Sequence, residues 1–300
     1  MFFEGSEKKI EILLKPGTTP LRRHPDIDWH HVVSLARATV LSTVSNELCD
    51  AYLLSESSLF VFQHRVVMIT CGTTSLVAAV EEMLRTFNRD DILFLMYERK
   101  NELSPEDQHS DYEEDARRLR RFVPGNTTIF GKENDHYVAV FHYGPDCQPQ
   151  ATDMTLEVLM HEIDREAAAP FMQADIGKPA LYERTGVNRI FDEFAIDDFI
   201  FDPMGYSLNG ICEREYYTFH ITPQSECSYA SFETNRVFGE GELEATLNKV
   251  LAIFRPRIVT AVYFDKNAAG IAVPTGYSAR TASQQRFCGF DVLFANYRKA

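Results

Sequence analysis

Apolar and polar residues follow one another in blocks along the chain, and these blocks predict the secondary structure. Residues 7–14 (EKKIEILL) end in an apolar run that predicts a strand. Residues 15–28 carry prolines and a glycine, as is typical of a loop. Residues 29–48 repeat apolar side chains at helical spacing and predict an amphipathic helix. Residues 51–70 interrupt apolar runs with the polar tetrapeptide SESS, which predicts a β-hairpin.

The first half of the chain continues with one more helix and a polar segment. Residues 74–88 place apolar side chains on one face of a predicted helix, with Thr73 or Thr74 as its N-cap. Residues 101–116 are acidic and polar, so we expect them to be exposed. The arginines that follow within 117–121 are predicted to lie on the solvated face of a short helix.

The second half of the chain repeats this theme. Residues 164–198 read as loop and short helix, a helix is predicted at 241–254, and strands are predicted at 136–143, 155–161, 198–202, 205–212, 215–221, 227–233, 257–265 and 287–295. Pro256 ends the last helix. The pattern therefore favours an α+β protein of two antiparallel sheets, each with helices on its outer face.

Composition and charge narrow the classes of function. The 300 residues are 45% hydrophobic and 25% charged, which is typical of a soluble globular protein. A net charge of −14 repels phosphate backbones, so we expect no nucleic-acid partner and some attraction for a cationic ligand. No apolar run approaches the roughly 18 residues of a membrane span. The start, MFFEGSEKK, lacks the features of a signal peptide, so a cytoplasmic protein without a membrane partner is predicted.

Metal and nucleotide chemistry find little support in the motifs. The six cysteines form no CxxC pair, so we expect free thiols in a reducing compartment. The histidines lack the spacing of metal ligands, and no metal site is predicted. The chain has no GxGxxG, P-loop, HExxH or GxSxG motif.

Three short polar islands inside apolar strands are the candidate chemistry. They are SESS at 55–58, TCGTT at 70–74, and HITP at 220–223, the last preceded by GYS at 205–207. A serine, a cysteine and a histidine can act as nucleophile, acid and base. Taken singly, each island also has a structural explanation: a turn, small buried residues before a helix, or a core histidine. The residues alone leave both explanations open.

Together, the islands and their flanks resemble the eukaryotic-type S-adenosylmethionine decarboxylases. The motifs that carry the resemblance are FFEGSEKKIEI (2–12), AYLLSESSLFVF (51–62), ITCGTT (69–74), DMTLEVLM (153–160), FDPMGYSLNGI (201–211) and FHITPQSECSYASFETN (219–235). They occur in the same order over nearly the whole chain. The resemblance implies one domain over residues 1–300, folded as a four-layer αββα sandwich, and a homodimer of processed protomers.

The resemblance also implies a proenzyme that cuts itself between Glu56 and Ser57. The Ser57 hydroxyl would attack the Glu56 carbonyl and convert the amide into an ester. Because an amide is more stable than an ester, this step needs backbone strain or a placed proton donor. His220 would then remove the Ser57 α-proton, and Ser207 would assist through hydrogen bonds.

Cleavage would leave residues 1–56 as a small β chain and 57–300 as an α chain that begins with a pyruvoyl group. Loss of CO₂ from an α-amino acid leaves electrons on Cα that ordinary side chains cannot accept, so an electron sink is needed. By resemblance, the substrate amine forms a Schiff base with the pyruvoyl ketone at position 57, and Cys71 returns a proton to Cα. A thiol, with a pKa of about 8.5, suits that role.

The implied substrate is S-adenosylmethionine, and several residues match its binding site. Phe3 and Phe201 would sandwich the adenine and attract the sulfonium centre. Leu54 and Glu56 would present backbone groups to the adenine edge. The chain departs from the family at Gln224, where a glutamate normally accepts hydrogen bonds from the ribose. A neutral acceptor predicts weaker ribose binding.

Acidic residues complete the set of candidates. Glu4 and Glu7 match residues near the family's active site. Some members are activated by putrescine at a buried acidic site, which matches Asp153, Thr155, Glu157 and Glu233. Responsive members often carry a lysine in place of Ile69 and a tyrosine in place of Phe290, so the response of this chain to putrescine stays open.

Two alternatives to the main hypothesis remain. A pyruvoyl-dependent decarboxylase of ornithine or arginine would fit the change at Gln224. An inactive regulatory partner of a decarboxylase would lack processing residues, whereas Ser57, Cys71, Ser207 and His220 are all present.

Overall fold

A computed structural model describes residues 3–132, 135–224, 227–268 and 270–300, and the chain divides into two compact units. Unit 1 comprises Met1–Gly5 and Pro149–Ala300, and unit 2 comprises Ser6–Gln148. Each unit contains one eight-stranded antiparallel sheet.

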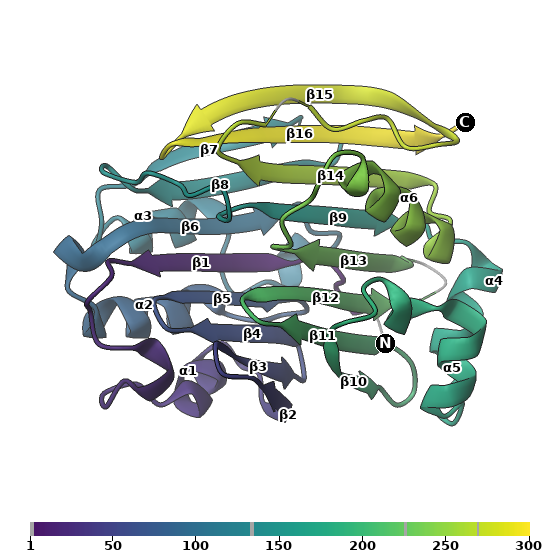
Figure 1. Cartoon of the computed structure of the whole chain (residues 1–300), viewed down its shortest axis with the longest axis horizontal. Coiled ribbons are helices and arrows are strands. Elements are labelled where there is room, and N and C mark those ends of the chain that lie inside the picture. The colour runs from purple at the N-terminus through teal and green to yellow at the C-terminus, as the bar shows by residue number, and fades with distance from the viewer. Residues whose placement is uncertain (1–2, 133–134, 225–226, 269) are drawn as a thin grey trace. The chain divides into compact units, whose positions relative to one another are not determined.

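The sheet of unit 2 has the strand order β2-β3-β4-β5-β1-β6-β8-β7 (Figure 1). Its strands are β1 (Lys8–Leu14), β2 (Val40–Ser45), β3 (Cys49–Leu54), β4 (Ser57–Phe62), β5 (Arg65–Thr70), β6 (Ile92–Lys100), β7 (Asn126–Gly131) and β8 (Tyr137–Tyr143). Its α-helices are α1 (Trp29–Leu35), α2 (Leu76–Thr86) and α3 (Tyr112–Leu119). The first strand of the chain, β1, therefore lies in the interior of the sheet, between β5 and β6.

One face of this sheet packs against the three helices. Alternate residues of β1, including Ile10 and Ile12, join Val80 and Met83 of α2 and Leu119 of α3 in a single apolar core. Burial of each large apolar side chain contributes roughly 1.5–3 kcal/mol. The apolar residues that alternate along the strands thus pack against the apolar face of the helices, which form one layer on one side of the sheet.

The sheet of unit 1 has the order β10-β11-β12-β13-β9-β14-β16-β15 (Figure 1). Its strands are β9 (Thr155–His161), β10 (Ala195–Ile200), β11 (Tyr206–Cys212), β12 (Glu215–Thr222), β13 (Tyr229–Thr234), β14 (Ile258–Asp265), β15 (Tyr277–Phe287) and β16 (Phe290–Lys299). Its α-helices are α4 (Arg165–Ala168), α5 (Lys178–Thr185) and α6 (Glu242–Phe254). The order is that of unit 2 with eight added to each strand number, so the two units share one topology.

The core of unit 1 is rich in aromatic rings. Phe219 of β12 contacts Phe232 of β13 with ring centroids 5.0 Å apart, and Phe254 of α6 with centroids 5.6 Å apart. Leu247 and Val250 of α6 belong to the same cluster. The helices of unit 1 therefore cover one face of its sheet, as in unit 2.

The predicted fold class is confirmed: the chain is α+β, with two antiparallel sheets and helices packed on one face of each. The four-layer order concerns both units together and stays a prediction. In the described part of the chain, no helix combines the length and the apolar character needed to cross a bilayer. The structure describes all six cysteines, and none of them forms a disulfide.

The helix predicted over residues 29–48 is wrong beyond Leu35. Helix α1 ends there, Arg37 adopts a φ of +64°, and β2 follows. The side chains of β2 alternate between half-buried and exposed, which is the period of a strand. The β-branched residues of this segment, such as Val40 and Val44, favour that conformation.

Other predictions about elements also need correction. Strands β6, β7 and β15 were not predicted. Strand β6 is an almost continuously buried run, which period-two alternation cannot reveal. The N-cap of α2 is Ser75, so the prediction of Thr73 or Thr74 is wrong. The Thr74 hydroxyl instead bonds the Thr70 hydroxyl and the Cys71 carbonyl, each at 2.9 Å.

Candidate active site

The predicted cleavage site is a two-residue hairpin turn in unit 2. Ser55 and Glu56 connect β3 to β4, and Leu54 pairs with Ser57 across the turn. The Ser55 N–H donates to the Thr39 carbonyl at 2.8 Å, and the Ser55 hydroxyl accepts from the Thr39 N–H at 3.0 Å. These two bonds fasten the turn to the segment that precedes β2.

Ser57 combines backbone strain with a buried hydroxyl. Its φ of +130° lies far from the left-handed basin near +57° that residues other than glycine tolerate. Its side chain is 1% exposed, and Oγ forms no hydrogen bond with the described residues. Backbone strain of this kind costs about 1–3 kcal/mol, and strained positions cluster at functional sites.

The carbonyl oxygen of Glu56 is held by Cys71. The Cys71 N–H donates to it at 3.0 Å, and the Cys71 Sγ lies 3.6 Å from it. Strand pairing explains the contact: β4 and β5 are antiparallel and Ser57 lies opposite Thr70, so Glu56, which precedes Ser57, meets Cys71, which follows Thr70. Two donors on a carbonyl oxygen can stabilise the negative charge that forms when a nucleophile adds to the carbon.

The electrostatics of this hairpin favour protonated groups. Burial raises the pKa of the Cys71 thiol well above its usual value, and the nearby carboxylates of Glu56 and Glu7 raise it further. The thiol therefore carries its proton at neutral pH, as a proton donor must. Burial also raises the pKa of Glu56 to about 7.

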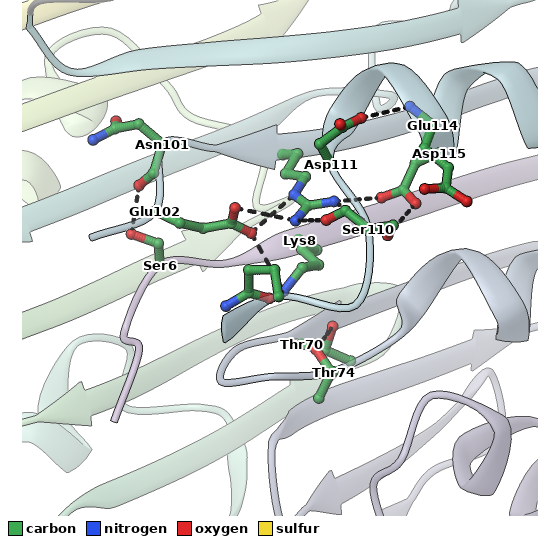
Figure 2. A network of polar contacts seen from close by, with 12 residues as sticks. Ser6, Lys8, Thr70, Thr74, Asn101, Glu102, Ser110, Asp111, Glu114 and Asp115 are labelled. Carbon is green, nitrogen blue, oxygen red and sulfur yellow. Dashed lines mark hydrogen bonds and ion pairs between the residues drawn. The ribbon is translucent and has the colours of Figure 1, made fainter. Parts of the chain in front are cut away.

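A buried polar network supports the loop that follows Cys71 (Figure 2). The Lys8 Nζ donates to the Gly72 carbonyl at 3.2 Å and to Gln108 Oε1 at 2.8 Å, and lies 3.5 Å from a Glu102 carboxylate oxygen. Burial lowers the pKa of Lys8, which the Glu102 carboxylate partly offsets. The network thus anchors the turn at Gly72 to β1, in the interior of the sheet.

The network extends to helix α3 through two charged residues. Arg99 pairs with Glu102 at 2.8 Å and with Asp115 at 2.7 Å, and Asp115 also accepts from the Tyr97 hydroxyl at 2.6 Å. Asp115 is 1% exposed, so the prediction that residues 101–116 are exposed is wrong at this position. The reason is that a buried guanidinium requires a buried counter-charge.

In unit 1, His220 lies between two hydroxyls. The Ser207 Oγ is 3.0 Å from Nδ1, and the Thr218 Oγ1 is 2.9 Å from Nε2. Ser207 faces His220 directly across β11 and β12, which places both side chains on one face of the sheet. Burial lowers the pKa of His220 to about 3, so the imidazole is neutral at physiological pH. A neutral imidazole keeps one nitrogen free to accept a proton.

Two residues of this site were missed in the sequence. Thr218 contacts the ring of His220, and Asn209 Oδ1 lies 3.1 Å from the Thr218 hydroxyl. The signal was the period of the strand, because Thr218 and Asn209 lie two residues from His220 and Ser207 and therefore share their face.

Phe201, predicted to contact adenine, lies just after β10. Its ring is half-buried and meets the Phe199 ring edge to face, with centroids 4.9 Å apart. The Phe201 N–H donates to the Gly205 carbonyl at 3.0 Å, which closes the turn. Gly205 has a φ of +117°, so a side chain there would be strained.

Phe3 and Gln224, both in unit 1, are joined by a hydrogen bond. The Phe3 N–H donates to Gln224 Oε1 at 3.0 Å, and the Cys227 Sγ lies 3.5 Å from the same oxygen. A Cβ at Gly5 would lie 2.9 Å from Tyr229, so only glycine lets the N-terminal segment pass this ring. The side-chain carbonyl of Gln224 therefore positions Phe3.

The predicted putrescine residues lie on and beside β9 and β13 of unit 1. Glu157 pairs in register with Glu233, and both are buried. Glu233 accepts a hydrogen bond of 2.5 Å from the Tyr216 hydroxyl. Thr155 is buried at the start of β9. Asp153 is only half-buried and accepts from the Gln150 N–H at 2.8 Å, so the prediction of a third buried carboxylate is wrong.

The two positions that depart from putrescine-responsive members have apolar side chains in the structure. Ile69 pairs in register with Lys9 across β5 and β1, and Lys9 pairs with Glu98 of β6. A lysine is therefore present one strand away from the position where the family often has one. Phe290, in unit 1, contacts Phe264 with ring centroids 6.4 Å apart.

Each unit gathers a different set of the predicted residues. Unit 2 brings together Leu54, Glu56, Ser57 and Cys71 at the ends of β3, β4 and β5, and Glu7 lies 3.9 Å from the Lys100 ammonium. Unit 1 contains the other processing and substrate-binding candidates, namely Phe3, Glu4, Phe201, Ser207, His220 and Gln224, as well as the four putrescine candidates.

The motifs that carry these residues are also those of a known family. The sequence model described as adenosylmethionine decarboxylase matches residues 1–298. The chain belongs to the adenosylmethionine decarboxylase family. Family membership spans both units, and it was predicted from the motifs alone.

Curated relatives agree with this assignment. The S-adenosylmethionine decarboxylase proenzyme of Dictyostelium discoideum is 32% identical over 329 residues, covering 99% of this chain and 86% of the relative. That of Drosophila melanogaster is 32% identical over 332 residues, covering 99% and 95%. That of Leishmania donovani is 33% identical over 281 residues, covering 87% and 73%.

A solved structure supports the fold. The crystal structure of the Trypanosoma brucei AdoMetDC-delta26 monomer matches with a TM-score of 0.63 and 26% identity. The match covers 81% of this chain and 99% of that chain. The family and the relatives are named for S-adenosylmethionine as the substrate, so a decarboxylase of ornithine or arginine is not favoured.

Proposed function

We propose that the chain cuts itself between Glu56 and Ser57 and then decarboxylates S-adenosylmethionine with the pyruvoyl group that this creates. The observation that carries the proposal is the state of Ser57. Its backbone is strained, its hydroxyl is buried without a hydrogen-bond partner among the described residues, and the preceding carbonyl is held by two donors. These features fit a serine that is converted chemically into the pyruvoyl group.

In the first step, the Ser57 Oγ attacks the carbonyl carbon of Glu56. The C–N bond breaks, the Ser57 nitrogen leaves as an amine, and the two residues are joined by an ester. The Cys71 N–H and thiol stabilise the charge on the Glu56 oxygen. Relief of the strain at Ser57 offsets part of the cost of exchanging an amide for an ester.

In the second step, His220 removes the α-proton of Ser57. The Cβ–Oγ bond then breaks, a Cα=Cβ double bond forms at position 57, and Glu56 leaves with Oγ as the terminal carboxylate of residues 1–56. Water then hydrolyses the unsaturated residue at position 57, which releases ammonia and leaves a pyruvoyl group. The neutral state of His220 supports this role, because a protonated imidazole cannot act as a base.

The site fits the pyruvoyl group, since the atoms of a buried residue supply it. The group provides a carbonyl that accepts the electron pair left on Cα when CO₂ departs. Cys71 holds a proton on its thiol at neutral pH and returns it to Cα. Phe3 and Phe201 are half-buried, so each has ring surface available to the adenine and the sulfonium.

Gln224 has a narrower role than a glutamate would have. Its side-chain carbonyl accepts from the Phe3 N–H, and an amide has one acceptor oxygen where a carboxylate has two. We therefore propose that ribose binding is weaker than with a carboxylate acceptor. Leu54, Glu4, Glu7 and the backbone of Glu56 complete the proposed substrate contacts.

Three statements about partners and location stay predictions. The paired side chains of Glu157 and Glu233 offer the two amino groups of a diamine two carboxyl groups, so we propose putrescine as a ligand of this pair. Addition of putrescine should then raise turnover in the wild type and leave Glu233→Gln unaffected. A homodimer and a cytoplasmic location are also proposed, and light scattering tests the first.

Intact mass of the purified protein tests the central proposal. We expect two chains, divided before position 57, with a pyruvoyl mass on the larger one. CO₂ release should occur from S-adenosylmethionine and not from ornithine or arginine. A single uncut chain would overturn the cleavage, and release from ornithine alone would overturn the substrate.

A further inference from the structure

The side chains around His220 form two adjacent rows on one face of the unit 1 sheet. Strand pairing places Ser207 opposite His220 and Asn209 opposite Thr218 on β11 and β12. All four side chains are buried, and Asn209 is fully so. The contacts run from Asn209 to Thr218, then through both nitrogens of His220 to Ser207.

The protons available to these four side chains fix the direction of the hydrogen bonds between them. The Thr218 hydroxyl has one proton, and Asn209 Oδ1 can only accept. The 3.1 Å contact between them therefore uses the Thr218 proton. The 2.9 Å contact between Thr218 and Nε2 of His220 then needs a proton on the ring nitrogen, because the hydroxyl has none left to give.

We infer that Asn209, acting through Thr218, is a positioning residue that holds the ring proton of His220 on Nε2 and so makes Nδ1 the basic atom. The inference rests on the proposed role of His220 as the base. With Nε2 protonated, Nδ1 carries the lone pair and accepts from the Ser207 hydroxyl at 3.0 Å. The proton taken from Ser57 then goes to Nδ1.

A purely structural role for this row would be the simpler explanation. Buried hydroxyl and amide groups need hydrogen bonds wherever they lie, and these four uncharged side chains supply hydrogen bonds to one another. The two explanations differ in what they require of residue 209. A structural role requires a well-packed polar group at this position. The inferred relay, in which Asn209 acts through Thr218 on His220, requires an acceptor that faces Thr218.

The tautomer can be measured directly in a chain that stays whole. We would label Ser57→Ala proenzyme with ¹⁵N-histidine and assign His220 by its loss in a Ser57→Ala, His220→Gln double variant. We expect a protonated Nε2 and an unprotonated Nδ1. A proton on Nδ1 would overturn the inference whether or not the wild type cuts itself.

Substitutions of the relay give a second readout, the rate of cleavage by intact mass. Asn209→Leu and Thr218→Val should slow cleavage roughly tenfold or more, because the wrong tautomer of a catalytic histidine removes much of its effect. Asn209→Asp keeps an acceptor and Thr218→Ser keeps the hydroxyl, so both should cut at nearly the wild-type rate and retain the Nε2–H signal. Equal slowing by Asn209→Asp and Asn209→Leu would favour the structural role and overturn the relay.

Failure of the relay and failure of the proposed function are distinguishable. If His220→Gln cuts as fast as the wild type, the base is assigned wrongly and the proposed function fails. If His220→Gln is uncut while Asn209→Leu and Thr218→Val cut at the wild-type rate, the base stands and the relay is overturned. Melting temperatures of all variants would identify loss of folding as a separate cause.

Discussion

Two hairpins occupy the same place in the two sheets, and only one of them is predicted to be cut. The cleavage hairpin joins β3 to β4 through Ser55 and Glu56 in unit 2. The matching hairpin joins β11 to β12 through Glu213 and Arg214 in unit 1. Both turns have two residues, and both pairs of strands are second and third in their sheet order.

The two hairpins differ in which residue has a positive φ. In the matching hairpin the positive φ, +50°, belongs to Glu213 in the turn and lies in the left-handed basin. In the cleavage hairpin it belongs to Ser57, the first residue of the strand, and is +130°. Strain is therefore tolerable in one hairpin, and in the other it falls on the residue that carries the nucleophile.

The hairpins also differ in what holds the carbonyl before the strand. The Arg214 carbonyl accepts from the side-chain amide of Asn235, which follows β13, at 2.9 Å. The Glu56 carbonyl accepts from the backbone N–H of Cys71, which follows β5, and faces its thiol. A shared topology thus provides a held carbonyl in both units, and the residues at Ser57 and Cys71 make one of them reactive.

The largest expected effect is loss of cleavage in Ser57→Ala, which lacks the nucleophile. Intact mass should show one chain. As the matched control, Glu215→Ser places a serine after the turn of the matching hairpin, and we expect no cut there because the backbone is not strained at that residue. A cut before position 215 would show that serine alone suffices and would break the comparison.

The next largest effect is on turnover in Cys71→Ala. Removal of a proton donor costs about 10²–10⁴-fold, so CO₂ release should fall within that range. Cleavage should slow less, because the backbone N–H at position 71 still holds the Glu56 carbonyl. Asn235→Ala, the control, should lower stability by about 1–3 kcal/mol and leave cleavage unchanged.

A smaller effect is expected on the stability of uncut variants. Ser57→Gly should be more stable than Ser57→Ala by about 1–3 kcal/mol, because glycine tolerates a φ of +130°. The pair Glu213→Gly and Glu213→Ala should differ by only about 1 kcal/mol. Urea unfolding measures both differences, and equal values would mean that strain is not concentrated at Ser57.

The smallest effect is on the pH dependence of stability. Glu56 has a folded pKa of about 7, above the ordinary value of 4.5, so the folded chain binds more protons than the unfolded chain between these values. Stability of Ser57→Ala should therefore decrease as the pH rises from 4.5 to 7. Glu56→Gln should remove this decrease, whereas Arg214→Gln in the matching hairpin should not. The free energy of unfolding, measured by urea at pH 5 and at pH 8, would give the size of this decrease.

The sequence predicted the chemical residues better than it predicted their surroundings. Ser57, Cys71, Ser207 and His220 were found because polar islands in apolar strands are conspicuous and match long family motifs. The φ of Ser57 could not be found, since nothing in the local residues SESS distinguishes a strained backbone from an ordinary turn.

Long-range charge pairing was also beyond the sequence. Asp115 lies in an acidic segment that reads as exposed, and its burial follows from Arg99 on a strand that was not predicted. The two-sheet fold was predictable because strand and helix periods are local properties. The end of α1 at Leu35 was not predictable. The spacing of apolar residues over 29–48 fits one long helix almost as well as it fits a short helix followed by a strand.

The position of β1 in the interior of its sheet has a consequence for how the cut protein comes apart. The proposed cut leaves β1, β2 and β3 in the shorter piece, and β1 is paired on both sides with strands of the longer piece. Unfolding of the proenzyme is then unimolecular, whereas unfolding of the cut protein releases two molecules. Its melting temperature should therefore rise with protein concentration, as mass action requires, while that of Ser57→Ala stays constant.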